Sequence, residues 1–334
     1  MKFDIQRNTL STRRLFLKNS IAGMLGYGAV SSALLNAPSS AAAINQDDEV
    51  HDAALAAKLD NLVSSFHGDV GMYVRHLPTG RTAALRADEL FPTASLIKVA
   101  IMLALFDRIH RGELNYHQKL VYDGTYTYKG MNEDILSRFQ VGSEIRLSKL
   151  IMLMITISDN SASIWCQELA GSGTNINDVL EANGFDSLRI NSRTPGREEA
   201  YKQYGWGQAT PREMCDILVK IRNSQLIDRS ACEEMYRVLT RIYWSGEALS
   251  QIPPYVQAAS KQGALDRSRS EVVLVNAPSG DYVFSVITKN QEDTSWEDTN
   301  EGFVLLRDVS RLLWHHFEPD YGWEPAPKIN ALDR

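Results

Sequence analysis

Ser95 and Lys98 have the residue types and the spacing of a nucleophile and its base. They lie just before the apolar segment 99–106. A serine hydroxyl attacks a carbonyl effectively only when a neighbouring group takes its proton. At helical spacing, positions i and i+3 share a face, so the Lys98 amine can reach the Ser95 oxygen. Burial and a nearby cation lower the pKa of a lysine and allow it to act as this base. Pro92 and Thr93 just upstream predict that Ser95 lies at a helix N-terminus, where free N–H groups favour an oxyanion. Taken alone, the Ser-x-x-Lys pattern also fits a helix cap followed by a surface lysine.

A second polar motif, Ser-Asp-Asn at residues 158–160, separates the apolar run 150–155 from a helical pattern over 163–170. Its position predicts a turn between two buried helices. Three short polar residues there can be a helix stop and an N-cap. In the functional interpretation, the Ser158 hydroxyl relays a proton and the Asn160 amide holds a substrate carbonyl.

A third motif, Lys-Gln-Gly at residues 261–263, precedes an alternating strand over 272–275. Because Gly263 has no Cβ, a substrate could lie against the strand backbone at this position.

In order and spacing, the three motifs resemble the signature of class A β-lactamases and penicillin-binding proteins, which is Ser-x-x-Lys, Ser-Asp-Asn and Lys-(Thr/Ser)-Gly. Ser158 lies 63 residues after Ser95, and Lys261 lies 103 residues after Ser158, close to the class A pattern. The resemblance covers roughly residues 50–318. It departs from the family at Gln262, where the family has threonine or serine.

The resemblance implies a catalytic role for four residues. Ser95 would attack a carbonyl and become acylated, with Lys98 as its base. Ser158 would pass a proton to the leaving nitrogen. Lys261 would tune Ser158 and attract a substrate carboxylate.

The resemblance also implies a binding role for four residues: Asn160, Gln262, Gly263 and Ala264. Asn160 would hold a side-chain amide of the substrate, and the Ala264 N–H would complete the oxyanion site with that of Ser95. Gln262 can donate a hydrogen bond to a carboxylate, although its longer side chain also crowds that group. Arg267 and Arg269 either assist there or lie at a solvated hairpin tip.

The main departure lies between residues 184 and 211, where class A β-lactamases carry an omega-shaped loop with a glutamate that activates water. Anchoring that segment on Gly184 and on the Thr-Pro pair at 210–211 places Thr194 at the glutamate position. Threonine has no useful basicity near neutral pH. Glu198 or Glu199 would have to activate the water instead, and otherwise they form a solvated acidic pair.

The expected fold is an α+β, β-lactamase-like one. Segments 71–75 and 82–85 predict one hairpin, and 271–275 with 282–289 predict a second. Residues 95–244 are mostly helical in pattern, and 302–317 form an amphipathic helix. We therefore expect an antiparallel sheet flanked by helices (about 50–94 and 250–318), an all-helical lobe (about 95–245), and the active site between them.

The first 43 residues have the pattern of an export signal. Residues 12–18 read Thr-Arg-Arg-Leu-Phe-Leu-Lys, a twin-arginine motif, and a mildly apolar stretch leads to three alanines at 41–43. We expect cleavage there and a periplasmic or secreted hydrolase domain over 44–334. Retention of the segment as a membrane anchor is the alternative.

The amino-acid composition limits the kinds of partner that the protein can bind. The chain has 334 residues, of which 44% are hydrophobic, and removing the signal changes its formal net charge from −6 to −10. An acidic protein of this kind argues against nucleic acid as a partner. We expect a monomer that needs no cofactor and no metal. The cysteines Cys166, Cys215 and Cys232 are expected to be buried free thiols.

Three functions fit these residues. The first, which we favour, is an exported serine hydrolase that hydrolyses β-lactams. The second is a penicillin-binding enzyme of the DD-peptidase or amidase type, acting on cell-wall peptides. The third is a β-lactam-binding sensor that is acylated and does not turn over.

Overall fold

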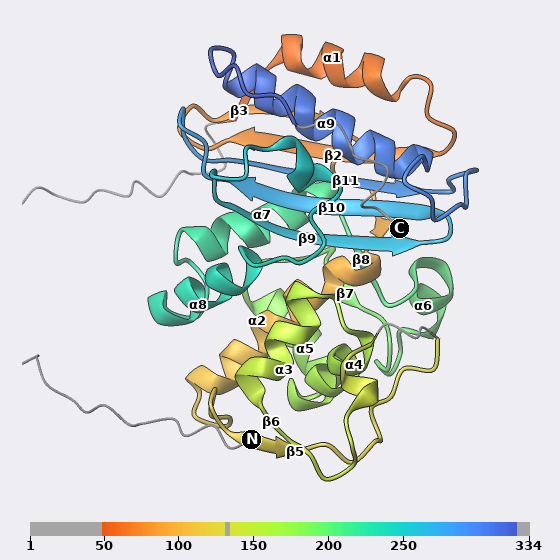
Figure 1. Cartoon of the computed structure of the whole chain (residues 1–334), viewed down its shortest axis with the longest axis vertical. Helices are drawn as coiled ribbons and strands as arrows, with labels where there is room; N and C mark the ends of the chain where they lie inside the picture. Colours follow the sequence, from red (N-terminus) through yellow and green to blue (C-terminus); the bar gives the residue numbers. More distant parts are fainter. Residues whose placement is uncertain (1–48, 131–133, 326–334) are drawn as a thin grey trace, which may run out of the picture. The chain divides into compact units, whose positions relative to one another are not determined.

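A six-stranded sheet with helices on both faces organises the chain in the computed structural model (Figure 1), which describes residues 49–130 and 134–325. The predicted signal segment, residues 1–43, lies outside the described residues. The strand order across the sheet is β1 (Val50–His51), β3 (Arg81–Leu85), β2 (Asp69–His76), β11 (Tyr282–Lys289), β10 (Ser268–Val275) and β9 (Ala258–Leu265).

Both predicted hairpins are confirmed. Strands β2 and β3 pair antiparallel, as do β10 and β11, and β9 pairs antiparallel with β10 at the edge of the sheet. The sheet is not wholly antiparallel as expected, because the two-residue strand β1 pairs parallel with β3. So short a strand carries no alternating pattern, and the sequence gives no signal for its direction.

Alternation along the strands divides the core between the two faces of the sheet. Val273 and Val275 pack with the helices α1 (Ala53–Val63) and α9 (Glu301–Phe317), whereas Val272 and Leu274 pack toward the other helices. This period of two is the one expected of a strand that is buried on both faces. The amphipathic helix predicted over 302–317 is confirmed as α9.

The helical lobe surrounds α2 (Lys98–His110), in which every side chain from Lys98 to Phe106 is buried. A helix that is apolar on all sides must be enclosed, and here other helices enclose it. These are α3 (Leu147–Thr156), α4 (Asn160–Leu169), α5 (Ser172–Ala182) and α8 (Arg229–Leu239). The lobe also contains the short strands β4 (Phe91–Pro92), β5 (Lys119–Val121), β6 (Glu144–Arg146), β7 (Arg189–Ile190) and β8 (Gly207–Ala209), and the helix α6 (Glu198–Tyr204). The described residues also form three 3₁₀ turns, which are η2 (Ala94–Ile97), η3 (Leu136–Arg138) and η4 (Ala248–Gln251).

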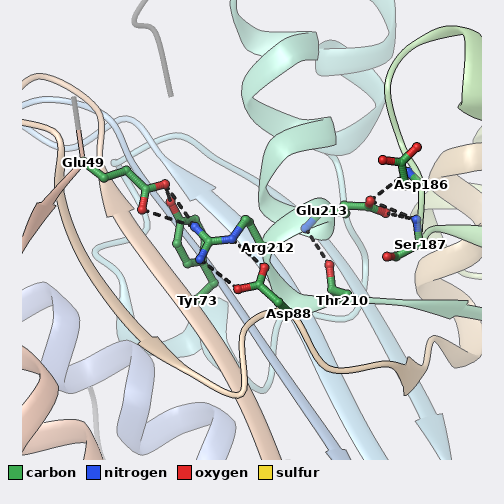
Figure 2. Close-up of polar contacts among 8 residues, drawn as sticks. All are labelled: Glu49, Tyr73, Asp88, Asp186, Ser187, Thr210, Arg212 and Glu213. Atoms are coloured by element: carbon green, nitrogen blue, oxygen red, sulfur yellow. Dashed lines mark hydrogen bonds and ion pairs between the residues drawn. The ribbon is translucent and has the colours of Figure 1, made fainter. Parts of the chain in front are cut away.

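Helix α7 (Pro211–Arg222) connects the lobe to the sheet, and its first turn makes contacts in two directions (Figure 2). The Arg212 guanidinium donates to Glu49 and Asp88 at 3.0 and 2.7 Å and lies 4.4 Å from the centre of the Tyr73 ring. The neighbouring Glu213 carboxylate accepts backbone N–H groups from residues 186–188. The first turn of α7 therefore holds Glu49 and Asp88 on one side. On the other side it holds residues 186–188, which lead into the omega-like loop.

The cysteines are free and buried, as expected. Among the described residues, no helix combines the length and the apolar character needed to cross a bilayer.

Candidate active site

Ser95 lies in the turn η2, immediately before α2. The sequence predicted Ser95 at a helix N-terminus, and the structure places it in a 3₁₀ turn that runs directly into the α-helix beginning at Lys98. The Lys98 N–H donates to the Ser95 carbonyl, and in such a 3₁₀ turn the side chains at i and i+3 eclipse each other. The Ser95 and Lys98 side chains therefore project from the same side. Ala94 has a φ of +44°, a left-handed conformation that non-glycine residues rarely adopt, and it turns the chain into this arrangement.

Strand β9 packs closely on the Ser95 turn through Gly263. A Cβ placed on Gly263 would lie 2.7 Å from the Thr93 carbonyl oxygen and 2.9 Å from the Ser95 amide nitrogen. Only glycine allows an approach this close. The contact places the Ser95 N–H against β9 at Gly263, the residue before Ala264, whose N–H the family resemblance pairs with that of Ser95 as an oxyanion donor.

The Ser158 hydroxyl joins the three motifs. Lys98 Nζ donates to Ser158 Oγ at 3.0 Å, and Lys261 Nζ donates to the same oxygen at 3.1 Å. Lys98 Nζ also donates to the Ser158 carbonyl at 2.6 Å and to Asn160 Oδ1 at 2.8 Å. The predicted turn between two helices is confirmed here, since it connects α3 to α4. Ser158 has a φ of +61°, and rare backbone conformations of this kind are often held at functional sites.

Both lysines are completely buried, and this changes their acidity. Burial lowers the pKa of Lys98 to about 7, even though the carboxylates of Asp134 and Asp159 favour its charged form. Burial, together with the nearby charge of Lys98, holds the pKa of Lys261 well below its usual range. An amine with a pKa of about 7 is available as a proton acceptor at neutral pH.

Two buried carboxylates hold residues 158–160 in place. Asp134 accepts the N–H groups of Asn160 and Ser161 at 2.9 and 2.8 Å, and Asp159 accepts those of Ala162 and Leu136 at 2.7 and 3.0 Å. Sequence reasoning missed Asp134, because no local pattern connects this acidic residue to a turn 26 residues away.

Trp206 forms an aromatic wall beside Lys98, and no sequence pattern distinguishes it from the other tryptophans. The Lys98 Nζ lies 5.9 Å from the centre of the indole, and the Tyr128 ring meets the indole edge-on at 5.6 Å. The Trp206 carbonyl accepts the N–H groups of Asn191 and Ser192, at the start of the omega-like loop.

Thr194, at the expected glutamate position, is buried. Its hydroxyl donates to the Ser192 carbonyl at 3.1 Å, and a Cβ on Gly173 would lie only 1.7 Å from its Oγ1. The two proposed stand-ins are exposed at the start of α6. Glu198 accepts the Gly196 N–H at 3.1 Å, and Glu199 pairs with Lys202 at 2.7 Å.

Arg269 is not at a solvated tip as the sequence suggested. It is fully buried between the rings of Trp296 and Phe303, with each ring centre 4.5 Å from its guanidinium carbon. Arg267 is exposed and lines a cavity of about 590 Å³ between α6 and the ends of β9, β10 and β11. Ser95, Lys98, Ser158 and Lys261 do not line this cavity.

Comparison with known proteins places this site in a family. The model of the β-lactamase enzyme family matches residues 54–317, which include the motifs at 95–98, 158–160 and 261–263. The chain belongs to the β-lactamase enzyme family. This membership makes it a β-lactamase-like serine hydrolase.

Three similar proteins share about a fifth of their residues with this chain. β-Lactamase VEB-1 of Pseudomonas aeruginosa is 21% identical over 273 residues, which cover 79% of this chain and 90% of VEB-1. A solved structure of PBP-A has a TM-score of 0.70 at 22% identity and covers 81% of this chain and 98% of PBP-A. A β-lactamase structure from Sphaerobacter thermophilus has a TM-score of 0.69 at 22% identity, over 79% of this chain and 97% of that protein. These structures confirm the expected α+β fold.

Proposed function

We propose that Ser95 forms an acyl-enzyme with β-lactams and that the protein hydrolyses them slowly. The observation that carries this proposal is the convergence of Lys98 and Lys261 on one hydroxyl, Ser158, beside the turn that holds Ser95. Two amines of lowered pKa and a hydroxyl form a short path for protons between a nucleophile and a leaving group.

Acylation then follows from these contacts. Ser95 Oγ attacks the lactam carbonyl, and its proton moves to the neutral Lys98 amine. The oxyanion is stabilised by the N–H groups of Ser95 and Ala264. The C–N bond breaks, Ser158 gives its proton to the lactam nitrogen, and Ser158 regains a proton from Lys98 or Lys261.

Deacylation lacks an evident base. Thr194 cannot accept a proton at neutral pH, and Glu198 and Glu199 are exposed and bonded to other groups. The loss of a general base costs roughly 10²- to 10⁴-fold in rate. We therefore propose an acyl-enzyme that forms faster than it is hydrolysed, with Lys98 as the remaining candidate to activate water.

A penicillin-binding enzyme that acts on cell-wall peptides is the second candidate, and Thr194 favours it. Such an enzyme can transfer its acyl group to an amine and does not depend on a glutamate to activate water. In either case we propose that residues 1–43 export the protein by the twin-arginine route to the periplasm or beyond. We expect a small-molecule β-lactam or a peptidoglycan-like amide as the substrate and a monomer as the working form.

The deciding experiment follows colour and protein mass together. The domain over 44–334 is mixed with a chromogenic cephalosporin, and both product and covalent adduct are measured. We expect an adduct on Ser95 that is absent in Ser95→Ala, with a burst of one product per protein before a slow steady rate. Release of D-alanine from a cell-wall peptide would instead support the second candidate. A wild-type protein that gives neither adduct nor product would overturn the acyl-enzyme.

A further inference from the structure

The Gln262 carboxamide has no hydrogen-bond partner among the described residues. Both its Nε2 and its Oε1 are inaccessible to solvent, although Gln262 lies next to Lys261 on the strand that borders Ser95. A buried amide without partners is unfavourable, because each polar atom has lost its hydrogen bond to water. Gln262 and Lys261 project from opposite faces of β9, but β9 is the edge strand of the sheet. A substrate that lies along this free edge is within reach of both side chains, because the flexible Gln262 side chain can turn its amide toward the edge.

The residue opposite Gln262 is an acid. Gln262 pairs with Glu271 of β10, and side chains directly opposite in an antiparallel pair lie on the same face with their Cβ atoms about 5 Å apart. The Glu271 carboxyl is buried and accepts hydrogen bonds from Ser260 Oγ at 2.6 Å and from the Ala248 N–H at 3.0 Å. This neighbour makes the position unfavourable for a second carboxylate.

The two arginines around this part of the sheet donate to other groups through their terminal nitrogens, although Arg269 Nε has no hydrogen-bond partner among the described residues. Arg269, on the same face and opposite Ala264, donates to the carbonyls of Ser268 and Ser295 at 3.0 and 2.6 Å. Arg307 forms an ion pair with Glu247, beside the N–H group that Glu271 accepts. Neither guanidinium is directed to a substrate carboxylate at Gln262.

We propose that Gln262, with Glu271 behind it, makes the enzyme select substrates that present an uncharged amide instead of a carboxylate beside Lys261. A carboxamide both donates and accepts, so a substrate amide can pair with Nε2 and Oε1 at once. An ionised carboxylate can satisfy only Nε2 and places its negative charge against Oε1 and Glu271. This inference rests on the proposed acyl-enzyme, since it concerns the substrate of that reaction.

The test compares two substrates that differ only in this group. One is a chromogenic cephalosporin with its free ring carboxylate, and the other is the same compound as the primary carboxamide. The second-order rate constant of acylation is measured for the wild type, for Gln262→Thr and for Gln262→Glu. Gln257→Thr is the matched control, because Gln257 is exposed just before β9.

We expect the wild type to react at least tenfold faster with the carboxamide. Gln262→Thr should speed acylation by the carboxylate at least tenfold and slow that by the carboxamide. Gln262→Glu should keep or increase the preference, because a second acid repels the substrate carboxylate while it still accepts a hydrogen bond from the carboxamide, and Gln257→Thr should keep it. A tenfold preference of the wild type for the carboxylate would overturn the inference while leaving the acyl-enzyme intact, as would equal effects of Gln262→Thr on both substrates. Failure of both compounds to label Ser95 in the wild type would overturn the proposed function as well.

Discussion

Lys98 combines complete burial with a full set of hydrogen-bond acceptors. Its ammonium donates to the Ser158 carbonyl, the Ser158 hydroxyl and Asn160 Oδ1, which satisfies all three N–H bonds. Loss of one proton leaves a lone pair among the same groups, and a neighbouring hydroxyl can then donate to it. The geometry thus accommodates both protonation states, as a group that receives and returns a proton requires.

The first prediction concerns the pH dependence of acylation. Only the neutral amine can accept the Ser95 proton, and burial lowers the pKa of Lys98 to about 7. The acylation rate constant should therefore rise with pH, by about tenfold per unit below pH 7, and level off above pH 8. Rapid mixing with a chromogenic cephalosporin between pH 5.5 and 8.5 measures this profile.

Two lysine variants provide the controls. Lys98→Arg keeps the positive charge but cannot lose its proton, so acylation should fall by more than about 100-fold. Lys202→Arg should have no effect, because that side chain is 71% exposed and pairs with Glu199. A pH-independent rate in the wild type would exclude Lys98 as the base.

At the scale of elements, the contact between β9 and the Ser95 turn is the most constrained feature of the site. Gly263→Ala would place a Cβ against the Thr93 carbonyl and the Ser95 amide, and backbone atoms cannot move aside as a flexible side chain can. We expect acylation to fall at least tenfold, because the strand and the turn must separate. Acylation kinetics and thermal unfolding of the variant measure the effect.

Gly246→Ala is the matched control for this prediction, since nothing lies within 4 Å of a Cβ at Gly246. The two variants make the same chemical change. If Gly263→Ala acylates as fast as Gly246→Ala does, β9 is not held against Ser95 in the way described.

The omega-like loop allows a second test at this scale. Thr194→Glu introduces a carboxylate at the position that the sequence comparison assigns to the base, and it should speed deacylation by roughly 100-fold. Thr194→Gln has nearly the same size and disturbs the packing against Gly173 equally, but it has no basicity. The acyl-enzyme lifetime, followed by protein mass, should shorten only in the glutamate variant. Equal lifetimes in two folded variants would contradict the loop alignment.

How far the sequence predicts each element depends on the distance between interacting residues. The start of α7 was predictable, because Thr210 accepts the Glu213 N–H three residues away and Pro211 suits the first turn. The other role of Glu213 was not predictable. Its carboxylate holds the N–H groups of Asp186 and Ser187, which are distant in the chain, and such contacts leave no local pattern (Figure 2).

The same distinction applies to the site. The motifs at 95–98, 158–160 and 261–263 were recognisable from residue type and order alone. Asp134 and Trp206 were not, because their roles arise only when the chain folds. The burial of Arg269 was also missed. The rings that enclose it, Trp296 and Phe303, are distant in the chain, so the residues around Arg269 in the sequence do not show whether it is exposed or buried.

At the scale of the whole molecule, three ionisable groups are buried together on two neighbouring strands and the adjoining helix. Lys98 and Lys261 have 0% of their surface exposed, and Glu271 has 1%. Burying a charge destabilises the folded state and so lowers the free energy of unfolding. The buried groups of the site therefore make the protein less stable than apolar residues would. This effect should be visible in how the free energy of unfolding depends on pH.

Glu271 makes this dependence measurable. Burial raises the pKa of Glu271 from its usual value of 4.5 to about 7. Between these two values the folded state binds more protons than the unfolded state, so the contribution of Glu271 lowers the free energy of unfolding as pH rises. Glu271→Gln removes this titration. The variant should resemble the wild type at pH 5 and be more stable at pH 8, by up to about 3 kcal/mol.

Urea unfolding of both proteins at pH 5 and pH 8 measures this change. Every other titrating group is present in both proteins, so the difference between them isolates Glu271 as long as the variant keeps the hydrogen bonds of Ser260 and the Ala248 N–H. Glutamine can keep both, because its oxygen accepts one and its amide nitrogen donates to the Ser260 hydroxyl. Glu199→Gln is the control and should show no such change, since the Glu199 side chain is 86% exposed.

A difference between wild type and Glu271→Gln that is the same at both pH values would mean that Glu271 is already ionised at pH 5 in the folded protein. The strand opposite Gln262 would then carry a permanent negative charge, which strengthens the exclusion of a substrate carboxylate but removes the pH dependence of stability.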